Sequence, residues 1–161
     1  LTTRRQRQMC IRDRICINDN VNVASKCKGL VDILHLGQTD MDPNEAKKLI
    51  DQNIQIGLSI TDENQLGNIP NCVNYLGVGP IFPTGSKIDA SEPMGSNTLK
   101  EIINKTNLPV VAIGGISIDI ICDLFKLGVS GVAVISAILN ENNPIENFQK
   151  IKENIIKGLK K

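Results

Sequence analysis

Short runs of β-branched and other apolar residues recur along the chain, and they constrain its fold more than any other feature. The runs begin near Ile15, Ile33, Ile54, Tyr75, Val110 and Gly131. Within each run the apolar residues are nearly continuous rather than alternating, a pattern typical of strands that are buried on both faces of a parallel sheet. The sequence therefore predicts six parallel β-strands.

Segments with helical periodicity separate these runs and predict helices over 99–104, 119–127 and 145–159. Another helix is predicted after Asp42, because Asp42 can cap it, Pro43 suits its first position and Glu45 completes a pattern like a capping box. Several predicted strands start about 21 residues apart, as in a repeating β-α unit with the helices outside the sheet.

This repeat predicts an α/β fold, and a TIM-type (β/α)8 barrel is the leading architecture. A doubly wound open sheet is the alternative. That fold usually carries its glycine-rich loop after the first strand, whereas the phosphate-type glycines of this chain come late in the sequence.

Composition and charge exclude several classes of protein. The 161 residues are 41% hydrophobic, and 18 basic against 17 acidic residues leave a formal charge of +1, so no global field attracts nucleic acid or a membrane surface. The chain lacks tryptophan and has one tyrosine, too few aromatic residues for a nucleic-acid stacking platform. No apolar run reaches the length of about 18 residues that spans a bilayer. We therefore expect a cytoplasmic protein that binds small molecules.

All five arginines lie between Leu1 and Arg14, and the rest of the chain uses only lysine. We interpret residues 1–14 as a non-native or disordered segment and residues 15–161 as a partial β/α-barrel domain. A basic, solvated tail is the alternative interpretation of the first segment.

Five cysteines form an odd set without a C-x-x-C pair, which fits neither a disulfide framework nor a zinc site. They are predicted to be reduced and mostly buried as small hydrophobic residues; they are Cys10, Cys16, Cys27, Cys72 and Cys122.

Late glycines predict an anion site. Gly114 and Gly115 end one predicted strand and precede Ser117, a plausible helix cap, so Gly115 would let backbone amides approach an anion at a helix N-terminus. The next strand, predicted within 131–138, ends in residues 134–137, which offer further amides and the hydroxyl of Ser136. In β/α barrels the loops after strands seven and eight commonly bind phosphate. A glycine pair alone is more often a tight turn.

Polar side chains follow the first two predicted strands. Asn18 and Asp19 end the first strand, and Asp40 follows the second. Two carboxylates together with waters and a pyrophosphate suit Mg²⁺, which prefers oxygen ligands. Asp19 and Asp40 can also be turn or cap residues.

The third and fourth predicted strands are followed by further candidate residues. Ser59 ends the third strand, and the fourth leads into a long polar loop that contains Thr84, Gly85, Ser86 and Lys87. The charge of Lys87 would stabilise a departing pyrophosphate, although a solvated surface lysine is the alternative. We expect His35, the single histidine, to be structural.

Six ordered motifs, at 17–19, 35–40, 57–61, 77–87, 110–117 and 131–138, resemble those of the thiamine-phosphate synthase family. The resemblance implies a β/α-barrel transferase that uses Mg²⁺. Such an enzyme joins hydroxymethylpyrimidine diphosphate to hydroxyethylthiazole phosphate, giving thiamine phosphate and pyrophosphate in thiamine biosynthesis.

The resemblance also implies roles for individual residues. Asn18, Ser59 and Lys87 would contact the pyrimidine diphosphate, with Ser59 and Lys87 catalytic, while Asp19 and Asp40 would hold Mg²⁺. The thiazole phosphate would be held by Thr84, Gly85, Ser86, Gly115, Ile135 and Ser136. The family loop reads Thr-x-Thr-Lys, and here Ser86 keeps the hydroxyl but loses a methyl group.

A larger departure concerns the N-terminal region, because nothing in the chain matches the family's Gln-Leu-Arg-x-Lys stretch that binds the diphosphate. We expect about six β-α units with the first two missing, an incomplete barrel and an inactive fragment. A thiazole tautomerase-like relative, which would not need the metal pair or the loop lysine, is one alternative. A non-catalytic phosphate-ligand-binding barrel is another, and the sequence leaves a homo-oligomer possible.

Overall fold

The structure, a computed structural model, describes residues 14–85, 92–139 and 143–160. The chain divides into two compact units. Unit 1 comprises residues up to Leu58 together with Pro70–Asn74, and unit 2 comprises Ser59–Ile69 and Tyr75–Lys161.

Every predicted strand is present. The strands are β1 (Cys16–Asn18), β2 (Ile33–Leu36), β3 (Gln55–Ile60), β4 (Val73–Val78), β5 (Val110–Ile113) and β6 (Gly131–Ala133). In unit 1, β2 pairs in parallel with β1 and with β3, and in unit 2, β5 pairs in parallel with β4 and with β6. The prediction of parallel strands is therefore confirmed.

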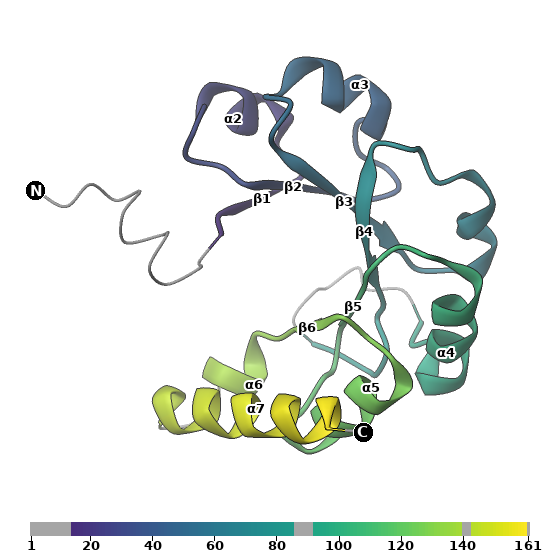
Figure 1. The fold of residues 1–161 in the computed structure, drawn as a ribbon, viewed down its shortest axis with the longest axis vertical. Coiled ribbons are helices and arrows are strands. Elements are labelled where there is room, and N and C mark those ends of the chain that lie inside the picture. Colours follow the sequence, from purple (N-terminus) through teal and green to yellow (C-terminus); the bar gives the residue numbers. More distant parts are fainter. Residues whose placement is uncertain (1–13, 86–91, 140–142, 161) are drawn as a thin grey trace, which may run out of the picture. The chain divides into compact units, whose positions relative to one another are not determined.

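The described helices follow the strands in alternation (Figure 1). They are α2 (Val21–Lys26), α3 (Pro43–Leu49), η1 (Glu63–Asn68), α4 (Gly95–Lys105), η2 (Ile118–Ile120), α5 (Ile121–Leu127), α6 (Ser136–Leu139) and α7 (Pro144–Leu159). The four predicted helices correspond to α3, to α4, to η2 with α5, and to α7. The short elements α2, η1 and α6 were not predicted.

One predicted boundary is wrong. The apolar run over 131–138 predicts a strand that ends in residues 134–137, but β6 already ends at Ala133 and Ser136 begins helix α6. Continuous apolar residues fit a buried strand and a short helix equally well, so periodicity could not separate the two.

Unit 1 has its core between its strands and the helices α2 and α3, which lie beside one another in Figure 1. Leu34 and Leu36 of β2, Ile56 of β3 and Ala46 of α3 are fully buried. Burial of such side chains is the main favourable contribution to folding.

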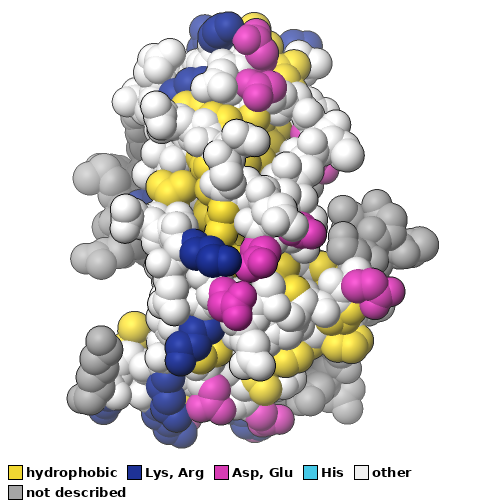
Figure 2. All heavy atoms as spheres, turned by 90° about the vertical axis from the view of Figure 1, so that its right-hand side faces the viewer, with side chains coloured by type: hydrophobic (Ala, Val, Ile, Leu, Met, Phe, Trp, Pro, Cys, Tyr) yellow, Lys and Arg dark blue, Asp and Glu magenta, His cyan; other side chains and the backbone are white. Residues whose placement is uncertain are grey.

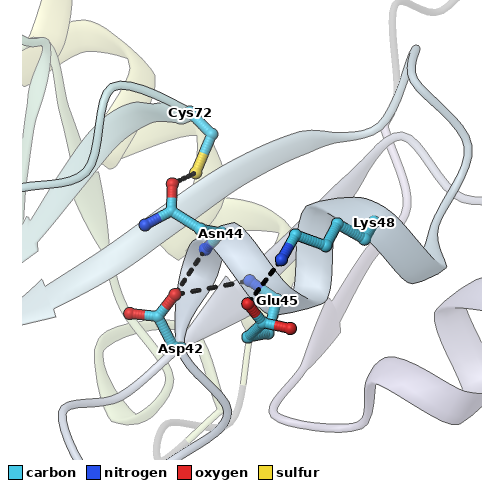
Figure 3. Close-up of polar contacts among 5 residues, drawn as sticks. All are labelled: Asp42, Asn44, Glu45, Lys48 and Cys72. Atoms are coloured by element: carbon cyan, nitrogen blue, oxygen red, sulfur yellow. Dashed lines mark hydrogen bonds and ion pairs between the residues drawn. The ribbon is translucent and has the colours of Figure 1, made fainter.

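Helix α3 begins as predicted (Figure 3). One carboxylate oxygen of Asp42, Oδ1, accepts hydrogen bonds from the backbone N–H groups of Asn44 (2.8 Å) and Glu45 (3.3 Å). Pro43 occupies the first turn. The Glu45 carboxylate pairs with Lys48 Nζ at 2.6 Å, and Cys72 Sγ donates to Asn44 Oδ1 at 3.5 Å. Asp42 therefore caps α3, as its sequence context predicts.

The core of unit 2 contains fully buried side chains from each of its layers: Leu76, Ile81, Leu99, Ile102 and Ile121. Helices α5 and α7 pack closely against each other (Figure 1). A Cβ atom at Gly158 of α7 would lie 2.6 Å from the Cys122 carbonyl oxygen and from Phe125 Cβ of α5. The glycine is therefore what allows this close approach.

The prediction that the cysteines are mostly buried is wrong. Cys16 is exposed, while Cys27, Cys72 and Cys122 are partly exposed, and Cys10 lies outside the described residues. None of these four described cysteines is in a disulfide. Cys16 lies in β1, whose residues alternate between exposed and partly exposed positions, so β1 does not bury its side chains as a central strand would.

Within the described ranges, no helix is both long and apolar enough to cross a membrane.

On the face drawn in Figure 2, acidic and basic side chains are interspersed with apolar ones. Several charged side chains form pairs, such as Lys105 Nζ with Glu63 Oε2 at 3.0 Å.

Candidate functional site

Asp19, directly after β1, has an unusual backbone conformation in unit 1. Its φ is +63°, in the left-handed region that few residues other than glycine adopt. Its N–H donates to the His35 carbonyl at the end of β2 (2.8 Å). On its other side, Asn20 Oδ1 accepts from the Val23 N–H (3.0 Å) and caps α2. The turn at Asp19 is therefore fixed both to the neighbouring strand and to the following helix.

Asp40 lies in the loop after β2. Its Oδ2 atom accepts a hydrogen bond from the Gly37 N–H at 2.6 Å, and its own N–H donates to the Gly37 carbonyl at 3.3 Å. A Cβ atom at Gly37 would lie 3.0 Å from Asp40 Oδ2. The carboxylate is thus folded back onto the carboxyl end of β2, where it stays exposed.

His35 links these two positions. His35 in β2 is paired with Asn18 in β1, and the His35 carbonyl accepts a hydrogen bond from the Asp19 N–H. Burial lowers the pKa of His35, while the negative charge of Asp40 opposes that shift. The lowered pKa favours the neutral imidazole near pH 7. Asn18, Asp19 and Asp40, here called the carboxylate rim, therefore lie at the carboxyl ends of two adjacent strands.

The donor atoms of the carboxylate rim fit a hard cation. They are carboxylate and amide oxygens on exposed residues, the ligand type that Mg²⁺ prefers. Among the described residues, no group of three or more His, Cys, Asp or Glu side chains could hold a metal. Two carboxylates would therefore need water or a phosphate ligand to complete the coordination, which is the usual arrangement for Mg²⁺.

In unit 2, the chain after β4 runs alongside the chain after β5. The Ile81 N–H donates to the Ile113 carbonyl at 3.0 Å, and the Phe82 N–H donates to the Gly114 carbonyl at 3.1 Å. The peptide bond between Gly79 and Pro80 is cis. The two loops thus satisfy each other's backbone groups, as buried backbone requires.

Three glycines, Gly79, Gly114 and Gly115, permit this contact and are here called the glycine cradle. A Cβ at Gly79 would overlap the Ile113 carbonyl, and one at Gly114 would lie 2.6 Å from Pro80 Cβ. At Gly115 a Cβ would lie 2.5 Å from the Pro83 carbonyl oxygen.

Gly114 and Gly115 also have positive φ, +90° and +64°. Sequence reasoning assigned Gly115 to anion approach alone; the structure adds a packing role, which depends on a loop distant in sequence.

Backbone contacts return the chain to the same place before α4. The Met94 N–H donates to the Pro80 carbonyl and the Gly95 N–H donates to the Ile81 carbonyl, both at 3.0 Å. Thr84 is partly exposed and Gly85 exposed in the loop that begins there. Ser86 and Lys87 lie outside the described residues.

The remaining predicted site residues of unit 2 lie at or after the ends of β3 and β6. Ile135, which is 62% exposed, and the partly exposed Ser136 follow β6, the strand that pairs with β5. Ser59 is partly exposed in β3. Ser117 occupies the N-cap position of η2 but makes no capping hydrogen bond with its side chain, so the prediction that it caps a helix is wrong.

The structure therefore places Gly115, Ile135 and Ser136 directly after two adjacent parallel strands, with Ser136 at the start of α6. Gly79 and the loop around Pro80 and Phe82 complete the surroundings of Gly115, and the sequence analysis did not single out Gly79. A signal was present, because a glycine directly before a proline at the end of a buried strand marks a special backbone position.

Comparisons with known proteins agree on one family. A family model described as thiamine monophosphate synthase matches residues 5–138. The thiamine-phosphate synthase of Lactococcus lactis subsp. lactis is 39% identical over 140 residues, which are 86% of this chain and 64% of that protein. The corresponding protein of Vibrio parahaemolyticus is 41% identical over 131 residues, 81% of this chain and 63% of that protein. The chain thus spans less than two thirds of the length of these relatives.

Solved structures support the same fold. The thiamine phosphate pyrophosphorylase of Pyrococcus furiosus superposes with a TM-score of 0.83 and 31% identity, covering 96% of this chain and 73% of that chain. A 3-hexulose-6-phosphate synthase of Salmonella typhimurium superposes with a TM-score of 0.70 at 14% identity, covering 94% of this chain and 77% of that one. The second likeness concerns the fold alone. The predicted class, an α/β fold of the TIM-barrel type, is confirmed.

Proposed function

Because the chain belongs to the thiamine monophosphate synthase family, we propose that it carries the substrate sites of a thiamine-phosphate synthase. The observation that carries this proposal is the family match over residues 5–138, which includes the loops of both the carboxylate rim and the glycine cradle. The proposed substrates are hydroxymethylpyrimidine diphosphate and hydroxyethylthiazole phosphate.

The glycine cradle of unit 2 is the proposed site of the thiazole phosphate. Gly115 and the residues that follow β6, Ile135 and Ser136, offer backbone amides and a hydroxyl at adjacent strand ends. Backbone amides at such ends bind phosphate well because their partial positive charges need no further reorganisation. Thr84 and Gly85 belong to the loop that contacts Gly115, which supports a place for them in the same site; Ser86 is proposed from the resemblance alone.

The carboxylate rim of unit 1 is the proposed Mg²⁺ site, with Asp19 and Asp40 as protein ligands. When bound there, Mg²⁺ would neutralise charge on the diphosphate leaving group. The hydrogen bond from the Gly37 N–H fixes the orientation of the Asp40 carboxylate. Asn18 is proposed to contact the diphosphate from the end of β1, and Ser59 and Lys87 are proposed to contact it by family resemblance.

In the proposed reaction, the C–O bond between the pyrimidine methylene and the diphosphate breaks, and its electron pair leaves with pyrophosphate. The lone pair of the thiazole nitrogen forms the new C–N bond, giving thiamine phosphate. Lys87 is proposed to stabilise the negative charge that grows on the leaving oxygen. In this proposal Mg²⁺ and Lys87 stabilise the negative charge of the diphosphate, and the thiazole site positions the nucleophile.

The test combines turnover with binding. The purified chain is mixed with both substrates and Mg²⁺, and thiamine phosphate and pyrophosphate are measured; any turnover should give the two products in equal amounts and should stop when EDTA is added. Calorimetry with each substrate alone reports on each site whether or not turnover occurs. A chain that forms no product and binds neither substrate would contradict the proposal. Turnover that persists in Asp40→Asn without metal would contradict the metal assignment alone.

A further inference from the structure

Asn147 of α7 is the one polar side chain that is fully buried among the described residues. Only 2% of its surface is exposed. Its Nδ2 atom donates to the Ile138 carbonyl of α6 at 3.3 Å. A buried amide is costly to desolvate unless its hydrogen bonds are made, so its presence at this position calls for a reason.

The hydrogen-bond acceptor of Asn147 lies in α6, a helix too short to be stable alone. Helix α6 has four residues, Ser136–Leu139, and none of them is buried. A single helical turn is unstable alone, because one or two hydrogen bonds do not offset the cost of ordering its backbone. Its internal bonds run from the N–H groups of Ile138 (3.1 Å) and Leu139 (3.0 Å) to the Ile135 carbonyl.

The carbonyl of Ile138 lies in the last turn of α6, where carbonyl groups lack a partner within the helix. Asn147 supplies that partner from α7, against which α6 packs (Figure 1). The first residue of α6 is Ser136, which the proposed function assigns to the thiazole phosphate. The buried amide is therefore connected to the proposed ligand residue through a single helical turn.

We propose that Asn147 is a positioning residue, which fixes α6 so that Ile135 and Ser136 keep the geometry that binds the thiazole phosphate. This inference rests on the proposed function. Asn147 does not contact the phosphate; it acts through the Ile138 carbonyl, which it holds in place. Asn147→Leu keeps a side chain of similar size, removes the amide donor and leaves that carbonyl without its partner.

The matched control is Asn154 in the same helix. Its Nδ2 atom also donates to a backbone carbonyl, that of Lys150 at 3.1 Å, but this bond stays within α7 and the residue is partly exposed. Asn154→Leu therefore removes an amide hydrogen bond of the same kind without touching α6.

The experiment measures the dissociation constants of Asn147→Leu, Asn154→Leu and the unaltered chain for hydroxyethylthiazole phosphate and, with Mg²⁺, for hydroxymethylpyrimidine diphosphate. Loss of one buried hydrogen bond predicts about tenfold weaker thiazole phosphate binding in Asn147→Leu. Pyrimidine diphosphate binding should stay within about twofold, because the bond acts on α6 alone. Amide hydrogen exchange at Ile138 and Leu139 should speed up in Asn147→Leu only.

Unchanged thiazole phosphate affinity in Asn147→Leu would overturn the inference, as would equal weakening for both substrates, which indicates general loss of structure. If the unaltered chain does not bind thiazole phosphate, the proposed function fails, and this inference fails with it. If Asn147→Leu does not fold, NMR of the unaltered chain tests the inference instead. Its Asn147 side-chain amide resonances should shift when thiazole phosphate binds while those of Asn154 do not, and an unshifted Asn147 signal would overturn the inference.

Discussion

The carboxylate rim of unit 1 and the glycine cradle of unit 2 both lie at the carboxyl ends of parallel strands, yet they are built in opposite ways. The rim offers exposed side chains, Asn18, Asp19 and Asp40. The cradle depends on missing side chains, because a Cβ at Gly79, Gly114 or Gly115 would overlap the neighbouring loop. Changes at the rim should therefore affect ligands more than folding, and changes at the cradle should affect folding first.

A similar contrast appears between the starts of α3 and α4. In unit 1, α3 begins with the Asp42 carboxylate as its cap. In unit 2, α4 begins without a side-chain cap, and its first N–H groups are held by backbone carbonyls of the loop after β4. A side chain thus fixes the start of α3, whereas backbone contacts with a distant loop fix the start of α4; η1 and α7 of unit 2 begin with the side-chain caps Asp62 and Asn143.

The largest expected effect is at Gly115. Gly115→Ala should lower the free energy of unfolding by about 3 kcal/mol, since it adds overlap with Pro83 and strain at a positive φ. Gly95 also has a positive φ but has open space around its Cβ position, so Gly95→Ala should lower the free energy of unfolding by about 1 kcal/mol. Gly67→Ala has neither problem and should cost nothing measurable. Chemical denaturation checks the series, and equal effects at Gly115 and Gly95 would show that the loop contact contributes nothing.

The next effect separates ligand binding from folding at the rim. Asp19→Asn should weaken Mg²⁺-dependent binding of the pyrimidine diphosphate about tenfold or more, since it removes a charged ligand. Asparagine tolerates a positive φ, so the unfolding free energy should barely change.

Asp51→Asn is the control, because the Asp51 Oδ1 atom accepts from the Asn53 N–H, a bond that asparagine keeps. Calorimetry and denaturation are run on each protein. If Asp51→Asn also binds the pyrimidine diphosphate tenfold more weakly, the effect of Asp19→Asn is not specific to the carboxylate rim.

A smaller effect concerns the cap of α3. Asp42→Ala should lower the free energy of unfolding by about 1 kcal/mol, because the N–H groups of Asn44 and Glu45 lose their acceptor. Asp42→Asn keeps an acceptor oxygen and should be nearly neutral. If both variants lose equal stability, the negative charge of Asp42 matters rather than its hydrogen bonds.

The smallest effect is at the surface of unit 2. Lys105→Ala breaks the exposed ion pair with Glu63 and should change the unfolding free energy by less than about 0.5 kcal/mol. Added salt should remove even that difference. A loss several times larger would mean that this ion pair contributes more to stability than exposed pairs normally do.

Features that depend on local sequence patterns could be predicted, and features that depend on contacts between distant residues could not. The six strands and the cap at Asp42 were predicted, since apolar runs and helix caps are local patterns. The contacts of Gly79 and Gly115 were not, because the partners Ile113 and Pro83 are distant in sequence. The burial of Asn147 was missed for the same reason: nothing in its helix distinguishes it from Asn154 until α6 packs against it.

Backbone NMR of the chain, with Mg²⁺ and thiazole phosphate added separately, tests whether the carboxylate rim and the glycine cradle bind different ligands. We expect Mg²⁺ to shift the amide signals of Asp19, Gly37 and Asp40, and thiazole phosphate to shift those of Gly115, Ile135 and Ser136. Each ligand should leave the other set in place, because one site uses carboxylates and the other backbone amides. The division is contradicted if thiazole phosphate shifts only the amide signals of the carboxylate rim, or if Mg²⁺ shifts only those of the glycine cradle.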